Sequence, residues 1–420
     1  MRTVSSKVVV RGFGALAVLS VFGLLAACGG GGSSSSSPPP VTGNNVQAIT
    51  VNGGPAPGVD YSDAAFTSVT VCVPSSSNCA TVDGILVDTG SVGLRLLASA
   101  IPSLALPELS GSGSTTYYNC VNFVDGTYLW GPVAQADIEM ASEKASAASI
   151  QLIEDPTGFS VPGACSQGGV NLDTLNALGA NGILGVGSYP QDCGQACQSS
   201  SSPNVYFTCG PTGPCSSQTI TVAQQVINPV IGFSTDNNGV VIEMQSVDGE
   251  AATAAGSMIF GIGTQSNNAL GSATVYTLSD SGFMTTDFNS ETLTESFIDS
   301  GSNGYFFPDS SIPQCAENSV APGFYCPNST LSLSAQNVTG SGGMNTVTFS
   351  VDNAVNDFNN FGSDTAFANL AGPNGTSNCG GGTACGFDWG LPFFFGRNVY
   401  VSIAGQSVPS GTPAAPWWAY

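Results

Sequence analysis

One short motif occurs twice in the chain, once in each half. Residues 84–93 read Gly-Ile-Leu-Val-Asp-Thr-Gly-Ser-Val-Gly, and residues 295–304 read Glu-Ser-Phe-Ile-Asp-Ser-Gly-Ser-Asn-Gly. In both copies an apolar stretch leads into an aspartate, Asp88 or Asp299, followed by Thr or Ser, then Gly and Ser. A lone Asp-Thr-Gly is also common turn chemistry that caps the end of a strand. Two copies, each directly after an apolar strand, indicate two matching halves with one Asp loop in each.

Most of the chain, from about Val46 onward, alternates short apolar segments with clusters of turn residues. Residues 66–72, 239–244, 346–351 and 398–403 have the period of two and the β-branched content of strands. Apolar residues make up 42% of the chain and charged residues only 8%, which suits many short strands around sizeable cores. The sequence therefore predicts an all-β fold. Helical signals are few: only residues 171–178 and 221–226 each predict a short helix.

The composition excludes several kinds of chemistry. The chain has no histidine, so a Ser-His-Asp or Cys-His catalytic unit and histidine metal sites are impossible. Hydrolysis would have to use carboxylates, hydroxyls or the few basic residues. After residue 11 the basic residues are only Arg95, Lys144 and Arg397, against 28 acidic ones. Such an acidic surface repels nucleic acid and anionic lipid headgroups. We expect no nucleic-acid partner, no metal and no cofactor.

The chain has thirteen cysteines, of which Cys28 belongs to the export segment described below. The other twelve form an even set with several close neighbours, which suits disulfides that close small loops. Zinc is a poor alternative without histidine and without two Cys-x-x-Cys pairs. The cysteines between Cys193 and Cys215 could also pair otherwise. The expected pairs are Cys72 with Cys79, Cys120 with Cys165, Cys193 with Cys197, Cys209 with Cys215, Cys315 with Cys326, and Cys379 with Cys385.

The N-terminus has the pattern of a secretory signal peptide at residues 1–27. Three basic residues lie in the first eleven positions, and the apolar stretch 12–27 is shorter than the ~20 residues that span a bilayer. Residues 25–28, Leu-Ala-Ala-Cys, resemble a bacterial lipobox, which implies that Cys28 carries a lipid. The alternative is ordinary cleavage near Ala27. Residues 28–45 would then be a lipid anchor and a flexible Gly/Ser/Pro linker. Gly29 in place of Asp resembles sorted lipoproteins of the outer membrane of diderm bacteria.

The two Asp loops and three further segments resemble pepsin-like aspartic proteases. Residues 181–187, 256–263 and 387–403 are similar to the strand beneath the first loop, the strand between the lobes, and the late segment of the second lobe. They come in the order of that family and extend the resemblance over about residues 46–403. The resemblance implies an all-β, two-lobed fold with a cleft, its lobes at residues 46–255 and 256–420. The chain also resembles a bacterial branch of lipoproteins whose function is unassigned.

The resemblance implies roles for both loops. Asp88 and Asp299 would face each other and share one proton, because two close carboxylates do not both ionise readily. The pair would activate a water for peptide hydrolysis without a metal. The glycines would let the backbone approach, the first hydroxyl of each loop would bond across the lobe junction, and the second would bond an outer carboxylate oxygen. The supporting residues would be Thr89, Gly90, Ser91, Ser300, Gly301 and Ser302.

Three departures from that family affect the expected site. Arg95 lies seven residues after the first Asp, where the family usually has Trp. We expect it either beside the pair, where its charge would lower the carboxyl pKa, or in a surface or interlobe ion pair. The hairpin over the cleft should lie around residues 123–131. Leu-Pro-Phe at residues 391–393 stands where the family tends to have Leu-Gly-Asp, and we expect the aromatic run 393–395 in the core. Candidates for the flap residue are Asp125, Tyr128 and Trp130.

Two functions follow from this interpretation. The first is a lipid-anchored, exported aspartic endopeptidase that acts on peptides or proteins. The alternative is a catalytically silent lipoprotein of the same fold that binds a peptide, glycan or partner protein in its cleft. The intact Asp loops favour the enzyme, whereas Arg95 and the unclear flap favour the alternative. In either case we expect a monomer that contacts the membrane through its N-terminal lipid only, in the outer membrane, facing the periplasm or the outside.

Overall fold

The computed structural model describes residues 10–12, 42–153, 159–210, 214–374 and 386–420. Of the predicted signal peptide, only β1 (Val10–Gly12) is described, paired antiparallel with β3 (Val59–Tyr61). Cys28, most of the linker and the expected pair of Cys379 with Cys385 lie outside the described residues. Within the described ranges, no helix has both the length and the apolar character needed to cross a bilayer.

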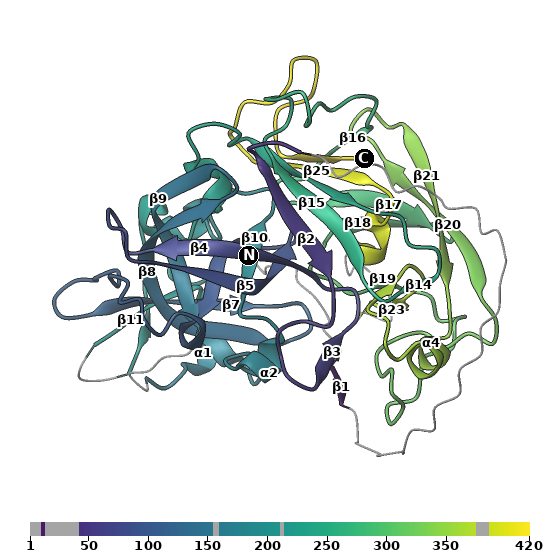
Figure 1. The fold of residues 1–420 in the computed structure, drawn as a ribbon, viewed down its shortest axis with the longest axis horizontal. Helices are drawn as coiled ribbons and strands as arrows, with labels where there is room; N and C mark the ends of the chain where they lie inside the picture. Colours follow the sequence, from purple (N-terminus) through teal and green to yellow (C-terminus); the bar gives the residue numbers. More distant parts are fainter. Residues whose placement is uncertain (1–9, 13–41, 154–158, 211–213, 375–385) are drawn as a thin grey trace, which may run out of the picture.

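The chain forms two β-rich lobes that lie side by side, the first half of the chain in one and most of the second half in the other (Figure 1). The remaining strands of the first half, up to the sequence between the lobes, are β2 (Val46–Val51), β4 (Ala65–Cys72), β5 (Cys79–Asp88), β6 (Val92–Leu97), β7 (Thr116–Asn122), β8 (Tyr128–Met140), β9 (Glu143–Ile153), β10 (Gly182–Val186), β11 (Tyr206–Cys209), β12 (Ser216–Ser217) and β13 (Gly239–Met244).

The second half contributes shorter strands. They are β14 (Glu250–Ala251), β15 (Ala254–Phe260), β16 (Val275–Thr277), β17 (Met284–Phe288), β18 (Glu291–Ile298), β19 (Tyr305–Phe307), β20 (Leu331–Val338), β21 (Met344–Val351), β22 (Ala366–Phe367), β23 (Ala371–Pro373), β24 (Asp388–Trp389), β25 (Asn398–Ser402) and β26 (Trp417–Ala419). The described helices are short: α1 (Gly163–Ser166), α2 (Leu175–Leu178), α3 (Gln195–Ser199), α4 (Ala354–Asn360), and the 3₁₀ turns η1 (Ala98–Ala100), η2 (Val222–Gln224), η3 (Pro229–Gly232) and η4 (Leu391–Phe394).

The first lobe contains a closed ring of strands. Its order is β4-β5-β10-β6-β9-β8, and β8 pairs back onto β4. Closure removes the free edges that would otherwise invite pairing with other chains. Successive side chains of each strand point to opposite faces of the sheet, and the apolar ones that face inward fill the ring. Strand β5, which ends at Asp88, therefore has a paired strand on each side.

A central run of strands joins the two lobes. The order β4-β2-β15-β13-β25-β26-β16 continues the large sheet from the first lobe to the C-terminal strand (Figure 1). β15 lies between β2, from the start of the described body, and β13. The expected boundary at residue 255 falls within β15, so the division of the chain into lobes at that residue stays a prediction.

The second lobe packs around a dense aromatic core. Its seven-stranded sheet has the order β21-β20-β17-β18-β24-β19-β23. The rings of Phe387 and Trp389 stack at 4.0 Å between centroids, and Phe307 stacks on Phe387 at 4.9 Å. The run Phe393, Phe394 and Phe395 is buried as predicted. Aromatic rings bury large areas, so this core fixes the short strands that carry the second Asp loop.

The predicted strands are confirmed and the predicted helices are wrong in extent. The strand segments coincide with β4, β13, β21 and β25 within one or two residues. Of the helix expected at 171–178, only the last turn forms, as α2. Asn171 instead bridges to Tyr128, and the side chain of Thr174 caps the helix by accepting from Ala177 N. The helix expected at 221–226 is the 3₁₀ turn η2, which ends at Gln225 in an extended conformation.

Five of the expected disulfides are confirmed. The pairs are Cys72–Cys79, Cys120–Cys165, Cys193–Cys197, Cys209–Cys215 and Cys315–Cys326. Each closes a loop of a few residues except Cys120–Cys165, which ties β7 to α1 across 45 positions. The alternative pairings between Cys193 and Cys215 are therefore excluded.

Candidate active site

Each Asp loop begins where a central strand ends. β5 ends at Asp88 and runs parallel to β10, whereas β18 ends one residue before Asp299 and runs parallel to β24. In both lobes the chain then turns back, and the next strand pairs antiparallel with the same partner. The strands before and after each loop flank the same partner strand, so each loop lies at the ends of these strands. The two loops meet there, between the lobes.

The two loops are joined by reciprocal hydrogen bonds. Thr89 Oγ1 donates to the carbonyl of Ile298 at 3.0 Å, and Ser300 Oγ donates to the carbonyl of Val87 at 2.8 Å. Each hydroxyl also accepts from the opposite backbone: Thr89 N donates to Ser300 Oγ at 3.1 Å, and Ser300 N donates to Thr89 Oγ1 at 3.0 Å. Both side chains are buried, so these four bonds fix the register of one loop against the other.

Asp88 and Asp299 share a backbone donor. Gly90 N donates to Asp88 Oδ1 at 2.8 Å and to Asp299 Oδ1 at 3.2 Å, and Gly301 N donates to Asp299 Oδ1 at 2.8 Å. Both aspartates are 0% exposed. A Cβ on residue 301 would lie 2.9 Å from Asp88 Oδ1 and 3.1 Å from Asp299 Oδ1. A side chain there would collide with the pair, so only glycine lets the loops approach this closely.

The outer carboxylate oxygens are bound by the serines three positions after each aspartate. Ser91 Oγ donates to Asp88 Oδ2 at 2.6 Å, and Ser302 Oγ donates to Asp299 Oδ2 at 2.9 Å. The structure thus brings together all eight residues of the predicted loops. Their contacts hold both carboxyl groups beside the N–H of Gly90.

The surroundings of Asp299 favour its neutral form. Burial contributes most to raising the pKa of the Asp299 carboxyl well above its usual range. The negative charges of Asp88 and Asp388 and a hydrogen bond with Asp88 act in the same direction, while the N–H of Gly301 opposes them. Because the two carboxyls interact strongly, the proton belongs to the pair. The pair can therefore hold one proton at a pH where an ordinary aspartate is ionised.

A pocket opens beside the first loop, at Thr89 and Gly90. Its walls come from both halves of the chain and are mostly apolar, with a few polar groups near the loop. The aromatic side chains that line it are Tyr189, Phe283, Phe297 and Trp418. A mostly apolar concave site with a few convergent polar groups is typical of a ligand pocket.

The three flap candidates lie elsewhere on the β7–β8 hairpin. Asp125 is exposed at its tip, and Tyr128 begins β8 with its N–H donated to the carbonyl of Val170. Trp130 is buried and its ring stacks on Tyr118 at 5.2 Å. None of the three is among the residues that line the described pocket. The choice of a flap residue stays a prediction.

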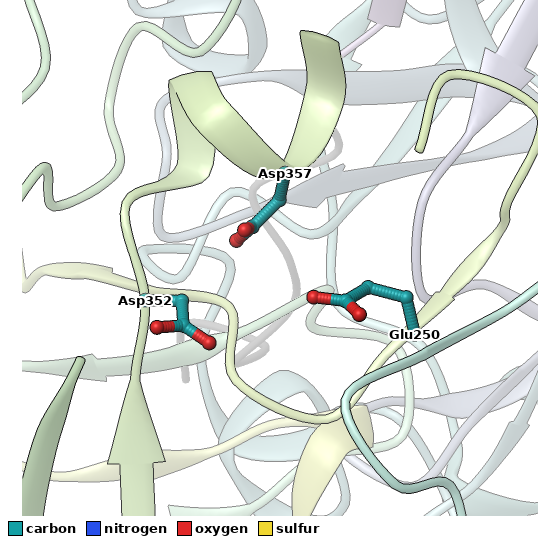
Figure 2. Close-up of side chains that lie close together, drawn as sticks. All are labelled: Glu250, Asp352 and Asp357. Carbon is teal, nitrogen blue, oxygen red and sulfur yellow. The ribbon is translucent and has the colours of Figure 1, made fainter. Parts of the chain in front are cut away.

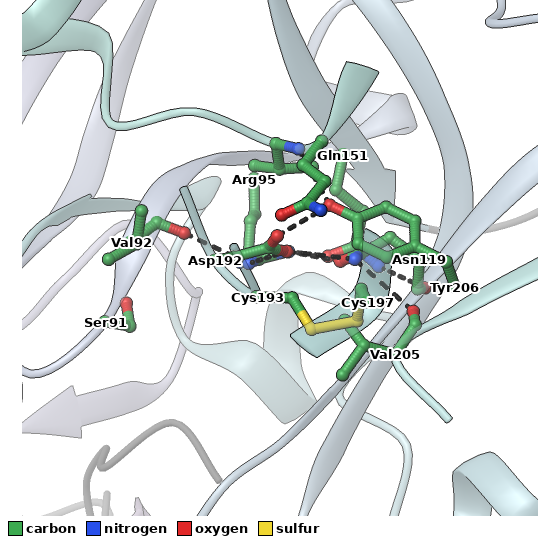
Figure 3. A network of polar contacts seen from close by, with 12 residues as sticks. Ser91, Val92, Arg95, Asn119, Gln151, Asp192, Cys193, Cys197, Val205 and Tyr206 are labelled. Atoms are coloured by element: carbon green, nitrogen blue, oxygen red, sulfur yellow. Dashed lines mark hydrogen bonds and ion pairs between the residues drawn. A yellow bond between two sulfur atoms is a disulfide. The ribbon is translucent and has the colours of Figure 1, made fainter. Parts of the chain in front are cut away.

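Arg95 is fully buried inside the first lobe, so the expected surface or interlobe ion pair is wrong. Its Nη2 lies 3.2 Å from Asp192 Oδ2, and its Nη1 donates to Asn119 Oδ1 at 2.6 Å and to Gln151 Oε1 at 2.7 Å (Figure 3). The expectation that Arg95 lowers the carboxyl pKa is also wrong for Asp299, whose pKa is raised by burial and by Asp88 and Asp388, with no effect of Arg95 among the causes. The guanidinium charge is compensated by Asp192.

Asp192 is the acceptor at the centre of this network. Tyr206 Oη donates to Asp192 Oδ1 at 2.6 Å, and Asn119 Nδ2 donates to Asp192 Oδ2 at 3.0 Å (Figure 3). Burial raises the pKa of the Asp192 carboxyl, whereas Arg95 and Tyr206 act in the opposite direction. A buried ion pair is tolerated when further hydrogen bonds satisfy its members. Both Nη atoms of Arg95 and both carboxylate oxygens of Asp192 are bonded, and only Arg95 Nε lacks a partner among the described residues. The network therefore has a structural role beneath the loop.

Asp388 is a third carboxyl at the site, which the sequence interpretation missed. Its Oδ2 lies 2.6 Å from Ser302 Oγ, within hydrogen-bonding distance of the same hydroxyl that contacts Asp299. Asp388 is 7% exposed and begins β24, beside β18. A signal was present in the sequence: an acidic residue in the otherwise apolar run 387–395, within a segment already matched to the second lobe.

Three other acidic side chains gather away from the Asp loops. Glu250 on β14, Asp352 after β21 and Asp357 in α4 point toward one another, with one oxygen of each within 4.8 Å of the others (Figure 2). Burial raises the pKa of Glu250, and the charge of Asp352 adds to the effect. Oxygen-only ligand sets suit hard cations such as Ca²⁺, but exposed acidic groups are also common without an ion.

Comparisons with known proteins place the chain in a family. A comparison with curated proteins found no match. Among solved structures, the crystal structure of the aspartic proteinase from Irpex lacteus is similar with a TM-score of 0.47 and 16% sequence identity, over 85% of this chain and 94% of that chain. The predicted all-β, two-lobed fold follows from the sheet topology itself. The family described as "Protein of unknown function (DUF3443)" matches residues 41–420, and the chain belongs to this family.

Proposed function

We propose that the protein is an aspartic-type endopeptidase in which Asp88 and Asp299 activate a water molecule between them. The observation that carries the proposal is the single N–H of Gly90, which reaches Oδ1 of both aspartates. Because the inner oxygens of the two carboxyl groups accept from the same N–H, both groups lie within reach of one small molecule. Their buried position and mutual repulsion support a shared proton.

The proposed chemistry balances without a metal or cofactor. The ionised carboxyl accepts a proton from the water as the water oxygen bonds to the substrate carbonyl carbon. The protonated carboxyl donates its proton to the carbonyl oxygen. When the tetrahedral intermediate collapses, the C–N bond breaks, the leaving amine receives a proton from one carboxyl, and a hydroxyl of the intermediate returns a proton to the other carboxyl. One shared proton is present at the start and at the end, so the pair is regenerated.

The pocket beside Thr89 and Gly90 supports a peptide as the substrate class. An extended peptide can bind through its main chain, with selectivity set by pockets for its side chains. The aromatic walls at Tyr189, Phe283 and Phe297 favour an apolar side chain next to the reacting bond. We expect cleavage of unfolded proteins beside apolar residues.

We further propose that the enzyme is a lipoprotein of the outer membrane in a diderm bacterium. The support is in the sequence: the apolar stretch 12–27 ends at Cys28, and a Gly/Ser/Pro linker follows. Such a linker would let the body reach substrates near the membrane. Labelling cells with a radioactive fatty acid tests the anchor. Label in the wild-type protein and none in Cys28→Ala is expected; equal label in both would contradict the proposal.

Pepstatin tests the proposed activity because it mimics the tetrahedral intermediate. The purified protein is incubated with a denatured protein substrate from pH 3 to 6, with and without pepstatin. We expect cleavage in acid that pepstatin suppresses. If no pepstatin-sensitive cleavage occurs at any pH, the endopeptidase proposal fails and a binding role for the cleft takes its place. Arg95 no longer favours that role, since its contacts lie inside the first lobe.

A further inference from the structure

Ser302 lies between two carboxyl groups, and it can donate its one hydrogen to only one of them at a time. Its Oγ is 2.9 Å from Asp299 Oδ2 and 2.6 Å from Asp388 Oδ2. A serine hydroxyl carries one hydrogen, and an ionised carboxylate can only accept. For both short contacts to be hydrogen bonds, one of the two carboxyls must carry a proton. The direction of the Ser302 hydroxyl is therefore tied to the protonation of its neighbours.

Packing alone does not require a carboxyl at position 388. In the first lobe β10 pairs with β5 so that Ile183 is opposite Leu86, and in the second lobe β24 pairs with β18 so that Asp388 is opposite Phe297. Both positions lie two residues before the strand partner of the loop aspartate. The first lobe places an isoleucine there and keeps the same backbone pairing. A buried carboxyl at such a position is costly unless it is hydrogen-bonded.

The titratable groups around Asp388 come from three directions. Asp299 faces it across Ser302, and both Asp88 and Asp388 act on Asp299 by their charge. Tyr305 on β19 pairs with Trp389 next to Asp388, and burial raises its pKa, so it stays neutral in acid. Arg397 and Asp63 act on Tyr305 with opposite signs. The carboxyl that shares a hydrogen-bond partner with Asp388 is thus that of Asp299.

We propose that Asp388 is a positioning residue that acts through Ser302 to set how firmly Asp299 holds its proton. When Asp388 is protonated, it donates to Ser302, and Ser302 donates to Asp299 Oδ2. When Asp388 ionises, Ser302 turns its hydrogen toward Asp388. Asp299 then loses a donor and gains a negative neighbour, and both changes strengthen its hold on the proton. The catalytic meaning of this coupling rests on the proposed peptidase function, but the coupling itself does not.

The test compares thermal unfolding of the wild-type protein and Asp388→Asn from pH 3 to 7. Asparagine keeps the shape and can donate to Ser302 but cannot ionise. The pKa of Asp299 is raised, in part by the charge of Asp388, and such a group contributes stability that is fully present below its unfolded pKa and is lost as pH rises through the folded pKa. Asp388→Asn should reduce that loss, so its midpoint relative to wild type should rise by about 2 °C or more between pH 3 and pH 7.

Two outcomes of this comparison would decide the proposal. A relative midpoint that rises with pH supports it, provided that Glu291→Gln, the same change of charge at the exposed first residue of β18, shows no such rise. A difference that is the same at every pH means that Asp388 only fills space, and the proposal is overturned. If Asp388→Asn fails to fold, Asp388→Leu, which copies the apolar first-lobe residue, replaces it in the same comparison.

The role of Ser302 is tested by a double-mutant cycle. With Ser302→Ala as the background, Asp388→Asn should give a pH-dependent rise less than half of that in the wild-type background, because the hydroxyl that connects the two carboxyls is gone. An equal rise in both backgrounds would show that Asp388 acts by charge alone and would overturn the Ser302 pathway.

Peptidase activity provides a second readout that separates this proposal from the proposed function. In an active protein, Asp388→Asn should move the alkaline limb of the kcat/KM profile to lower pH by about one unit, because Asp299 releases its proton more easily. An unmoved limb contradicts the catalytic meaning of the coupling. Absence of cleavage in the wild type sinks the proposed function, while the stability comparison still decides the coupling.

Discussion

Behind each Asp loop, two neighbouring strands bring a pair of side chains together, and the pairs differ between the lobes. In the first lobe Arg95, seven residues after Asp88, is paired with Ile183. In the second lobe Phe306, seven residues after Asp299, is paired with Asp388. The charged member is thus a cation on the returning strand of one lobe and an acid on the parallel strand of the other.

The two charges are used differently. Arg95 is held by Asp192, Asn119 and Gln151 inside its own lobe, away from the carboxyl pair. Asp388 instead bonds Ser302, which bonds the pair directly. The matching backbone therefore fixes where the two aspartates lie, while the residues behind the loops differ in role. Arg95 stabilises the first lobe, whereas we propose that Asp388 adjusts the pKa of Asp299. Substitutions in the two lobes should therefore have different effects.

The largest expected effect is on cleavage. Asp88→Asn and Asp299→Asn should each lower kcat/KM by about 10³-fold or more, because each removes one member of the acid–base pair. The measurement is initial rates on a fluorogenic peptide at the acidic optimum. Asp83→Asn, an exposed aspartate on the same strand β5, is the matched control and should retain activity. Residual activity in only one of the two variants would show that the lobes contribute unequally.

The next effect is on stability and should be confined to the first lobe. Arg95→Met leaves Asp192 buried without its cation, which should cost about 3–5 kcal/mol in the free energy of unfolding. Urea unfolding measures the loss, and Asp192→Asn in the same chain should recover part of it. Lys144→Met, which breaks ion pairs of a half-exposed lysine with Asp137 and Glu139, should cost less. A shifted pH–activity profile without destabilisation would contradict the structural role of Arg95.

The smallest effect tests how similar the loops are. Thr89→Val and Ser300→Ala each remove a hydroxyl that donates once and accepts once across the junction. Each should cost about 1–3 kcal/mol, because buried partners lose their bonds. Thr70→Val, which breaks an exposed hydroxyl pair with Thr81, is the control and should cost less. Urea unfolding of the three variants checks this, and unequal costs for the two loop variants would show an asymmetric junction.

The sequence predicted the site where local pattern and duplication agree. The Asp loops follow apolar strands in both halves, so strand pairing alone brings Asp88 and Asp299 to one junction. Arg95 could not be placed in this way, because its partner Asp192 is 97 positions away and becomes a neighbour only through the fold. Asp388 could have been found by matching residue 388 with Ile183, since an acid at the place of an apolar residue is informative.

The local helix signals failed for a related reason. Apolar and polar residues at 171–178 fit a helix, but Asn171 joins a bridge to Tyr128 and only the last turn forms. Tertiary hydrogen bonds outweigh the weak propensity of so short a segment. Four of the five disulfides were predictable because their cysteines lie close together in sequence and have few choices of partner. The packing of the β7–β8 hairpin instead depends on an aromatic cluster that no short motif specifies.

The shared proton is the central claim, and titration of the aspartate carboxyls tests it most directly. Carbon-13 chemical shifts of the Asp side chains are followed from pH 2 to 8, with the signals of the pair assigned from Asp88→Asn and Asp299→Asn. We predict two apparent pKa values for the pair, one of them well above the ~3.9 of an ordinary aspartate. If both carboxyls titrate together near the ordinary value, the pair holds no shared proton in the working range and the account is contradicted.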